Sequence, residues 1–287
     1  MIKRGKNINL YLIDGEVKGR LKCTLANWTG LIFKIPRTRL DITRDRVELK
    51  QSGIYFLFGS EEDSDKDSVY IGQAGIRANG EGLLYRINEH NKDATKDYWT
   101  EAVAVTTSNN SFGPTEISYL EHRIVQLAKD ANRYEVKNGN NPNIGNVTEE
   151  KQSELEDFLD SAKIVMGAMG YKIFEKVIDE DDKTDNELIF TYKVKNLITK
   201  GKRTSEGFVL LKGSSLSREI SKSVSVKVKT LREKNKDDIN GNFITINDIL
   251  FKSPSAAASF VSGNSVSGTL AWKTMNGDTL GDIINKE

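Results

Sequence analysis

The stretch GIYFLFGSEEDSDKDSVYIGQA, residues 53–74, decides the fold of the central part of the chain. Residues 53–59 form an aromatic and β-branched run, which is typical of a strand. Residues 60–68 are polar and acidic and predict a solvated loop, whereas residues 69–74 predict a second strand. The stretch therefore predicts a β-hairpin with a long connection.

The residues that follow this hairpin predict a β-β-α-β-α order. Apolar residues recur at helical spacing in 82–91, and residues 99–108 alternate like a strand. Residues 115–132 give the strongest helix prediction, because an apolar stripe runs along one face. Thr115 is the predicted N-cap of that helix.

Two tripeptides of the hairpin carry the candidate chemistry, Gly53-Ile54-Tyr55 and Tyr70-Ile71-Gly72. Either tripeptide alone occurs by chance in many strands. Arg86 and His90 follow on the next helix, four residues apart and therefore on one helix face. Glu121 lies on the later helix. These residues, in this order, point to one site.

Together they resemble the GIY-YIG nuclease domain, over residues 52–145. The resemblance implies an α+β fold in which a small antiparallel three-stranded sheet is flanked by helices. It also implies that Tyr55 is the general base or the group that positions water, and that Tyr70 supports Tyr55 and binds phosphate. Gly72 would let the backbone approach DNA.

Two substrate-binding positions fit the family pattern less closely. Gln73 stands where many relatives carry a basic residue, which leaves one phosphate contact open. The late asparagine of the family falls on Asn138, although three further asparagines stand in the same loop. These are Asn140, Asn141 and Asn143.

The chemistry of phosphodiester hydrolysis explains why such residues would gather. The substrate is anionic and gains charge on its oxygens during reaction, so the site needs positive groups and an activated water. Arg86 offers a planar fork of donors to phosphate. Glu121 offers a hard oxygen ligand, which suits Mg²⁺ (or Mn²⁺) because that ion keeps several waters. His90 belongs either to this site or only to the carbonyls of its own helix end.

Composition excludes several other classes of protein. The single cysteine, Cys23, excludes an internal disulfide and a thiolate zinc site, and two histidines without an HExxH spacing argue against a zinc enzyme. The sequence contains no apolar run of the ~18 residues that a membrane helix needs. The basic start, residues 1–6, is not followed by a signal-peptide core. We expect a soluble, cytoplasmic protein without a membrane partner.

The charges are distributed in blocks, although the net charge is only +1. Residues 1–50 hold twelve Lys and Arg against five Asp and Glu, and residues 201–236 hold ten against three. Residues 148–190 hold five against thirteen. The two basic blocks are either a cationic surface for phosphates or ordinary solvated faces.

The chain is predicted to contain four parts: an N-terminal β-rich module (1–51), the GIY-YIG nuclease domain (52–145), an acidic helical linker (146–186) and a C-terminal α/β accessory domain (187–287). In the last part, residues 251–283 resemble a bacterial domain of unknown function found behind GIY-YIG domains. That domain is similar to the restriction-enzyme-adenine-methylase-associated domain. Ser253 or Ser255 is predicted to cap a short helix there, and Trp272 is a core residue in the plainer interpretation.

The sequence thus predicts a metal-dependent endonuclease that acts on DNA, in restriction, repair or foreign-DNA handling. Two alternatives stay open at this point. The first is a DNA-binding module whose nuclease site is idle, and the second is a protein-interaction adaptor. The presence of both tyrosines, Arg86 and Glu121 favours the enzyme, because an idle site has no chemical need for all four groups.

Overall fold

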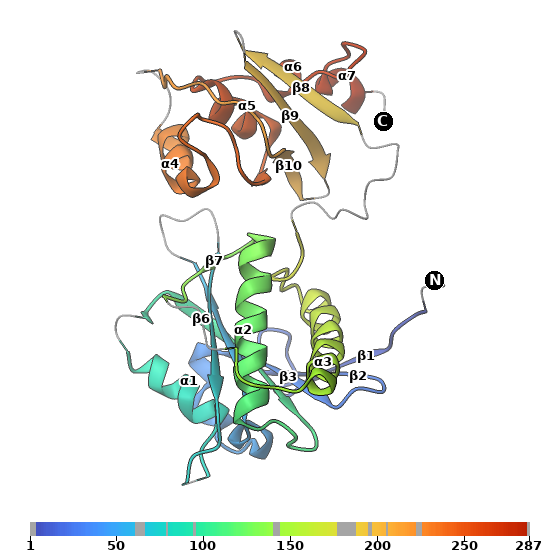
Figure 1. Ribbon diagram of the computed structural model, residues 1–287, viewed down its shortest axis with the longest axis vertical. Helices are drawn as coiled ribbons and strands as arrows, with labels where there is room; N and C mark the ends of the chain where they lie inside the picture. The colour runs from blue at the N-terminus through green and yellow to red at the C-terminus, as the bar shows by residue number, and fades with distance from the viewer. Residues whose placement is uncertain are drawn as a thin grey trace. The chain divides into compact units, whose positions relative to one another are not determined.

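The computed structural model describes residues 4–60, 67–78, 80–93, 96–139, 144–176, 188–194, 197–204, 206–221 and 226–285. The chain divides into two compact units, Met1–Lys176 and Val177–Glu287 (Figure 1). Among the helices in these described segments, none combines the length and apolar character that a membrane span requires. Both units contain helices and strands, which agrees with the predicted α+β class.

A mixed sheet forms the centre of the first unit. Over the described residues its strand order is β1-β2-β3-β6-β4-β5-β7. The neighbouring strands are antiparallel, except that β5 and β7 are parallel. The strands are β1 (Ile8–Leu12), β2 (Leu21–Leu25), β3 (Gly30–Pro36), β4 (Gly53–Gly59), β5 (Ser68–Ala74), β6 (Trp99–Thr107) and β7 (Glu135–Val136). The predicted hairpin is the β4–β5 pair, and residues 61–66 of its loop lie outside the described part.

The sheet is larger than the three strands that the resemblance implies. Strands β6, β4 and β5 are adjacent, and β3 pairs with β6 from Gly30↔Thr107 to Pro36↔Glu101. An unpaired edge of β6 would expose a row of backbone donors and acceptors, and β3 covers that edge. The strands of residues 1–51 therefore continue the central sheet, and the first compact unit includes them.

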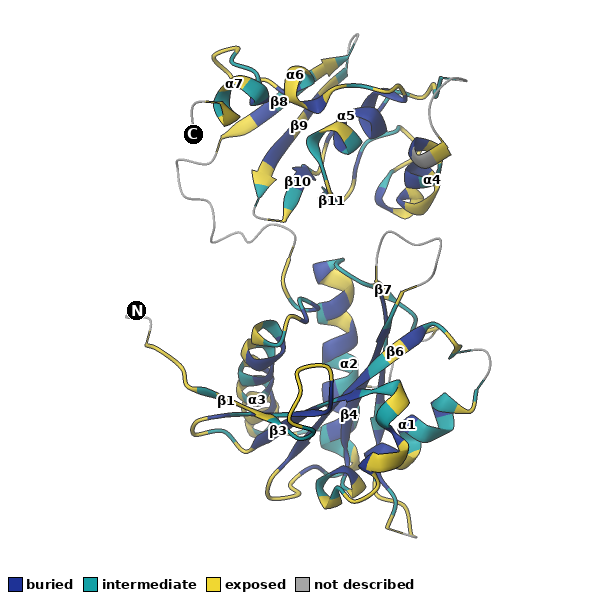
Figure 2. Cartoon of the chain, turned by 180° about the vertical axis from the view of Figure 1, so that it is seen from behind, coloured by how far each residue is buried: buried dark blue, intermediate teal, exposed yellow. Residues whose placement is uncertain are grey.

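Helices cover both faces of this sheet because its strands are apolar on both sides. Tyr55 and Leu57 face α1 (Leu83–Asn91) and belong to the core cluster that includes Leu83 and Ile87 of that helix. Ile54, Phe56 and Phe58 face the other way, into the core that α2 (Pro114–Ala131) and α3 (Glu149–Ala168) cover. Figure 2 shows the central strands almost entirely buried between these layers.

The start of α2 differs from the prediction. Gly113 is the N-cap in place of Thr115, and Pro114 occupies the first helical turn. Proline suits this position because its missing N–H would be unpaired there in any case. The Glu116 carboxylate then accepts a hydrogen bond from the Gly113 backbone N–H at 3.1 Å. Thr115 is thus already inside the helix.

The helix of the predicted acidic linker packs as part of the first unit. It corresponds to α3, whose Leu155, Leu159 and Val165 are buried in the core shared with α2. Most of its acidic residues are exposed, whereas Glu156 is partly buried and accepts from Tyr119 and Arg123 of α2, so the charge pattern of this segment mainly reports the solvated face of a packed helix. The acidic residues 177–187 lie outside the described residues.

Residues 37–50, between β3 and β4, form short turns. Three 3₁₀ segments are present, Arg37–Arg39, Asp41–Thr43 and Val47–Lys50. Leu40 and Leu49 are buried, whereas Val47 is exposed, so the apolar residues do not share the single face that an α-helix would bury.

The second unit contains an antiparallel sheet of order β11-β10-β9-β8 over its described residues. Its elements are β8 (Ile189–Val194), β9 (Leu197–Thr204), β10 (Gly207–Leu210), α4 (Val226–Lys234), β11 (Ile249–Phe251), α5 (Pro254–Ser262), α6 (Gly268–Ala271) and α7 (Leu280–Ile284). Ser253 caps α5 by accepting from the Ala256 N–H. Trp272 is fully buried and donates its indole N–H to the Pro254 carbonyl, which supports the core interpretation of this residue.

Candidate functional site

The two tyrosines of the hairpin lie on one face of the sheet. Strand pairing places Tyr55 opposite Gly72 and Leu57 opposite Tyr70, so the two phenols are diagonal neighbours. Their ring centroids are 6.2 Å apart. Tyr55 is only 1% exposed, whereas Tyr70 is partly exposed. The pairing thus creates a buried phenol next to a phenol that reaches solvent.

Gly72 makes room for the Tyr55 side chain. A Cβ atom at position 72 would lie 2.3 Å from the phenol oxygen of Tyr55, far inside contact distance. The resemblance gives this glycine the task of letting DNA approach the backbone. The structure supplies a different physical reason, because the space above Gly72 is occupied by the phenol itself.

We expect Gly72→Ala to displace Tyr55 and to destabilise the first unit by about 1–3 kcal/mol, the usual cost of overpacking. Gly75→Ala is the matched control, because the nearest atom to a Cβ there is Ile117 Cδ1 at 3.8 Å, an ordinary contact. Chemical denaturation of both variants measures the difference. Equal stabilities of the two variants would show that Tyr55 is not held against Gly72.

Helix α1 brings His90 and Arg86 to the Tyr55 hydroxyl. His90 Nε2 lies 2.7 Å from the Tyr55 oxygen, and His90 is 4% exposed. Arg86 acts on Tyr55 through its charge and through hydrogen bonding, while its Nη1 also contacts Glu89 at 2.6 Å. Leu83 and Ile87 bury the apolar side of the helix, which fixes the direction in which Arg86 and His90 point. His90 is thus part of the cluster, and not merely a helix-end residue.

Burial controls the protonation of the two partners. Desolvation raises the pKa of Tyr55 well above its ordinary range, and the neighbouring Tyr70 adds to that shift, whereas Arg86 opposes it. Desolvation, followed by the positive charges of Lys96 and Arg86, lowers the pKa of His90 to about 4. At neutral pH the pair is therefore a phenol and a neutral imidazole.

The lowered pKa of His90 predicts how the stability of the folded protein depends on pH. Unfolded His90 binds a proton below pH ~6.5, but the folded side chain resists protonation down to about pH 4. Stability is therefore lost as the pH falls through this window, by at most about 3 kcal/mol relative to a His90→Gln variant. Urea unfolding at pH 7, 5.5 and 4 measures it. His122→Gln, which keeps His90, is expected to retain the loss; parallel curves for wild type and His90→Gln would contradict the prediction.

Lys96 completes the cluster, and sequence reasoning did not identify it. Its Nζ lies 2.8 Å from His90 Nδ1 and 4.0 Å from the centroid of the Tyr70 ring. Burial lowers the pKa of Lys96, and Asp93 opposes that shift. Lys96 is one of 42 lysines and arginines and stands in no motif, so only the folded loop after α1 shows its position.

Glu121 approaches the site from α2 and is held by Gln73. The Gln73 side-chain amide donates to Glu121 Oε2 at 2.9 Å. Burial raises the pKa of the Glu121 carboxyl, while the hydrogen bonds from Gln73 and the charge of Arg86 oppose the shift. The resemblance left open which phosphate contact Gln73 makes, and in this structure Gln73 orients the carboxylate.

Glu121 and Tyr55 belong to opposite faces of the sheet, and the charge of Glu121 reaches the phenol only weakly, after those of Tyr70 and Arg86. Within the described chain, β7 pairs with β5 only at Ser68 and Val69. From Gly72 onward no described strand pairs with β5, although Gly72 and Ala74 are buried, and Gly72 adds no side chain to this edge. The Glu121 charge accordingly acts on the Tyr55 phenol, and the Arg86 charge acts on Glu121.

Asn138 extends the pairing of that edge by two hydrogen bonds. Its Oδ1 accepts from the Ile71 N–H at 3.1 Å, and its Nδ2 donates to the Ile71 carbonyl at 2.7 Å. Its amide thus mimics a strand next to the Tyr70-Ile71-Gly72 tripeptide. Three asparagines considered with it lie outside the described residues: Asn140, Asn141 and Asn143.

The donor set fits a cation that binds mainly through water. In the described part of the chain, no group of three or more His, Cys, Asp and Glu side chains could hold a metal ion. Glu121 offers a half-buried carboxylate, and its bond from Gln73 uses one of about four acceptor positions. One carboxylate with free positions suits Mg²⁺ or Mn²⁺, which retain waters and take phosphate oxygens as further ligands.

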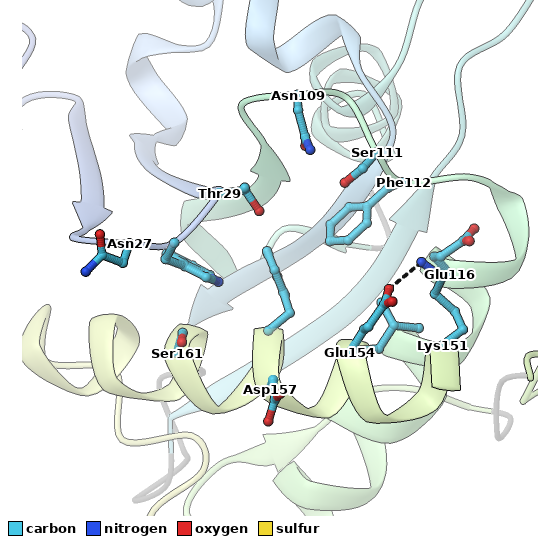
Figure 3. Close-up of a pocket in the computed structure, with 13 residues that line it drawn as sticks. Asn27, Thr29, Asn109, Ser111, Phe112, Glu116, Lys151, Glu154, Asp157 and Ser161 are labelled. Atoms are coloured by element: carbon cyan, nitrogen blue, oxygen red, sulfur yellow. Dashed lines mark hydrogen bonds and ion pairs between the residues drawn. The ribbon is translucent and has the colours of Figure 1, made fainter. Parts of the chain in front are cut away.

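A separate hollow of about 450 Å³ lies between α3 and the loops at the start of β3 and the end of β6 (Figure 3). Trp28 and Phe158 pack at 4.8 Å between ring centroids along its wall. Three of its charged groups have structural partners: Lys151 pairs with Glu154, the dashed line in Figure 3, and Glu116 caps α2. We assign no chemistry to this hollow.

Comparison with known proteins gives one match. The family described as Domain of unknown function (DUF4357) matches residues 190–284, which lie in the second unit. Residues 251–283, which carry the resemblance stated for the C-terminal part, fall within this span. No curated protein and no solved structure matches the chain.

Proposed function

We propose that this protein is a metal-dependent endonuclease that hydrolyses DNA phosphodiester bonds at the Tyr55 cluster. The observation that carries the proposal is a buried phenol oxygen with an imidazole and a guanidinium beside it, and with a carboxylate whose charge also reaches it. The Tyr55 oxygen lies 2.7 Å from His90 Nε2, and Arg86 and Glu121 both act electrostatically on the same phenol. Buried polar groups are costly unless they are paired. Ordinary surface residues would not require the polar groups of Tyr55 and His90 to be buried in this way.

Each residue then has a role that its position supports. Arg86 is half-exposed, so its guanidinium can bind a phosphate oxygen while it keeps its contact with Tyr55. Tyr55 stays a phenol, as its raised pKa requires, and positions the attacking water by a hydrogen bond, with His90 and Arg86 beside its oxygen, while the proton that the water loses passes to solvent. The water oxygen bonds to phosphorus, the bond to the leaving oxygen breaks, and that oxygen takes a proton from solvent.

Glu121 would hold the divalent cation, Mg²⁺ or Mn²⁺, which supplies positive charge to the phosphate when bound. Gln73 keeps the carboxylate oriented toward the edge of β5. Tyr70 lies beside this edge with its ring under Lys96, where a phosphate oxygen could accept from the phenol. A cellular role in restriction, repair or foreign-DNA handling follows only from the C-terminal resemblance and is part of the same proposal.

Incubation of the full chain with supercoiled plasmid tests the function. We expect nicked and linear products with Mg²⁺ or Mn²⁺, and none when EDTA is in excess. Retarded but intact DNA would overturn the proposal in favour of a DNA-binding module with an idle site. Intact and unretarded DNA would leave an interaction adaptor.

A further inference from the structure

The hydrogen-bond chain from Lys96 through His90 to Tyr55 has a defined direction. Lys96 Nζ lies 2.8 Å from His90 Nδ1, and His90 Nε2 lies 2.7 Å from the Tyr55 oxygen. A lysine ammonium has three donors and no acceptor, and a neutral imidazole carries its proton on one nitrogen only. Nδ1 must therefore accept from Lys96, and the ring proton must reside on Nε2.

The position of the ammonium is itself fixed by packing. Lys96 Nζ stands 4.0 Å from the centroid of the Tyr70 ring, within the range of a cation–π contact. The His90 ring lies 5.2 Å from the Tyr70 ring and 5.5 Å from the Tyr55 ring, beside both phenols. These two rings and the contacts of its two nitrogens hold the orientation of the imidazole.

We propose that Lys96 is a positioning residue that holds His90 in the tautomer protonated at Nε2, so that His90 donates to Tyr55. The Tyr55 oxygen then receives the imidazole N–H, and the phenol proton is free to point away from His90. The opposite tautomer would set an N–H against the ammonium and would make Tyr55 donate to His90. The role of this hydrogen bond in catalysis rests on the proposed nuclease function, whereas the assignment of the His90 tautomer does not.

The consequence for the reaction concerns the proton of Tyr55. The tautomer set by Lys96 gives the Tyr55 oxygen a donor from His90 in addition to that of Arg86, so the phenol keeps its own proton for donation elsewhere. The charged groups around the imidazole are Lys96, Arg86, Asp93 and Glu89, and burial together with the positive charges of Lys96 and Arg86 keeps the imidazole neutral. Without Lys96, the imidazole is free to take either tautomer, and in one of the two Tyr55 must donate its proton to His90.

Nitrogen-15 NMR of the full chain labelled in histidine measures the tautomer directly, because an unprotonated ring nitrogen resonates far downfield of a protonated one. The chain has two histidines, and His122→Gln assigns the signals of His90. At neutral pH we expect His90 to show an unprotonated Nδ1 and a protonated Nε2. A protonated Nδ1 in the wild-type protein would overturn the proposal, whatever any variant does.

Three lysine variants complete the test. Lys96→Met is expected to give a mixture of His90 tautomers, and Lys96→Arg, which restores a donor, is expected to return to the wild-type pattern. Lys92→Met, at an exposed lysine at the end of α1, is expected to change nothing. An unchanged Nε2–H pattern in Lys96→Met would also overturn the proposal.

Plasmid nicking separates this proposal from the function on which it rests. Lys96→Met is expected to lower the nicking rate by about 10- to 100-fold, the usual effect of removing a residue that orients a histidine, and Lys96→Arg to restore most of it. If the tautomer follows Lys96 but no variant cleaves DNA, the nuclease function fails and the positioning role stands. If wild type cleaves DNA and Lys96→Met retains both rate and tautomer, only the positioning role fails.

Discussion

Replacing Glu121 by glutamine is expected to lower the rate of metal-dependent plasmid nicking by about 10²- to 10³-fold, as the loss of one preorganised charged group at a transition state does. The side chain keeps its shape, and its contact with Gln73 can re-form through the amide oxygen. What is lost is the negative charge that would hold the cation and that acts on Arg86 and Tyr55.

The same substitution is expected to leave stability unchanged or to raise it. Burial raises the pKa of Glu121, so the folded protein favours the neutral carboxyl, and the stability associated with it is lost as the pH rises through that pKa. Glutamine is neutral at every pH and escapes this loss. Thermal unfolding at pH 7 measures the effect. We expect Glu121→Gln to lose nicking activity while its stability stays the same or rises.

Glu116→Gln is the control on the same helix. Glu116 accepts from the Gly113 N–H at the start of α2, and glutamine keeps an acceptor oxygen for this bond, so Glu116→Gln is expected to retain both stability and nicking. If Glu121→Gln were as active as Glu116→Gln, the proposed role of Glu121 as cation ligand would be wrong.

The local patterns of the sequence predicted the elements that carry the site. The hairpin, the apolar stripe of α2 and the i, i+4 spacing of Arg86 and His90 depend on neighbours in the chain, and the strands and helices occur where these patterns placed them. The same patterns placed Tyr55 and Gly72 on successive strands. They did not predict that these two residues stand directly opposite each other, because strand register also depends on the loop between them.

What the sequence could not predict arises from contacts between distant segments. Strand β3 joins β6 across some seventy residues of chain, and nothing local distinguishes this pairing from a separate module. The Gln73–Glu121 contact joins residues 48 positions apart. Lys96 belongs to a polar loop whose composition matches any solvated segment, and only the fold brings it against the His90 ring.

Replacing Tyr55 by phenylalanine is expected to abolish measurable nicking, because the phenol oxygen is the atom to which His90, Arg86 and the attacking water converge in the proposed mechanism. Loss of a general acid–base group typically lowers rates by about 10²- to 10⁴-fold. The variant also leaves the buried His90 N–H without the acceptor that it has at 2.7 Å. A buried donor without a partner costs about 1–3 kcal/mol, so stability should fall as well.

Tyr55→Phe is expected to lower both stability and activity. Removal of a second tyrosine hydroxyl, away from the site, distinguishes the two effects. Tyr119 is also buried, though at 7% exposed less completely than Tyr55 at 1%, and its hydroxyl donates to Glu156 of α3 at 2.9 Å, on the α2 and α3 side of the sheet. Tyr119→Phe is expected to cost comparable stability and to leave nicking near the wild-type rate. Denaturant unfolding and plasmid nicking are measured for both variants under the same conditions. Equal loss of nicking in the two would mean that the activity follows the stability of the first unit, and that Tyr55 has no chemical role of its own.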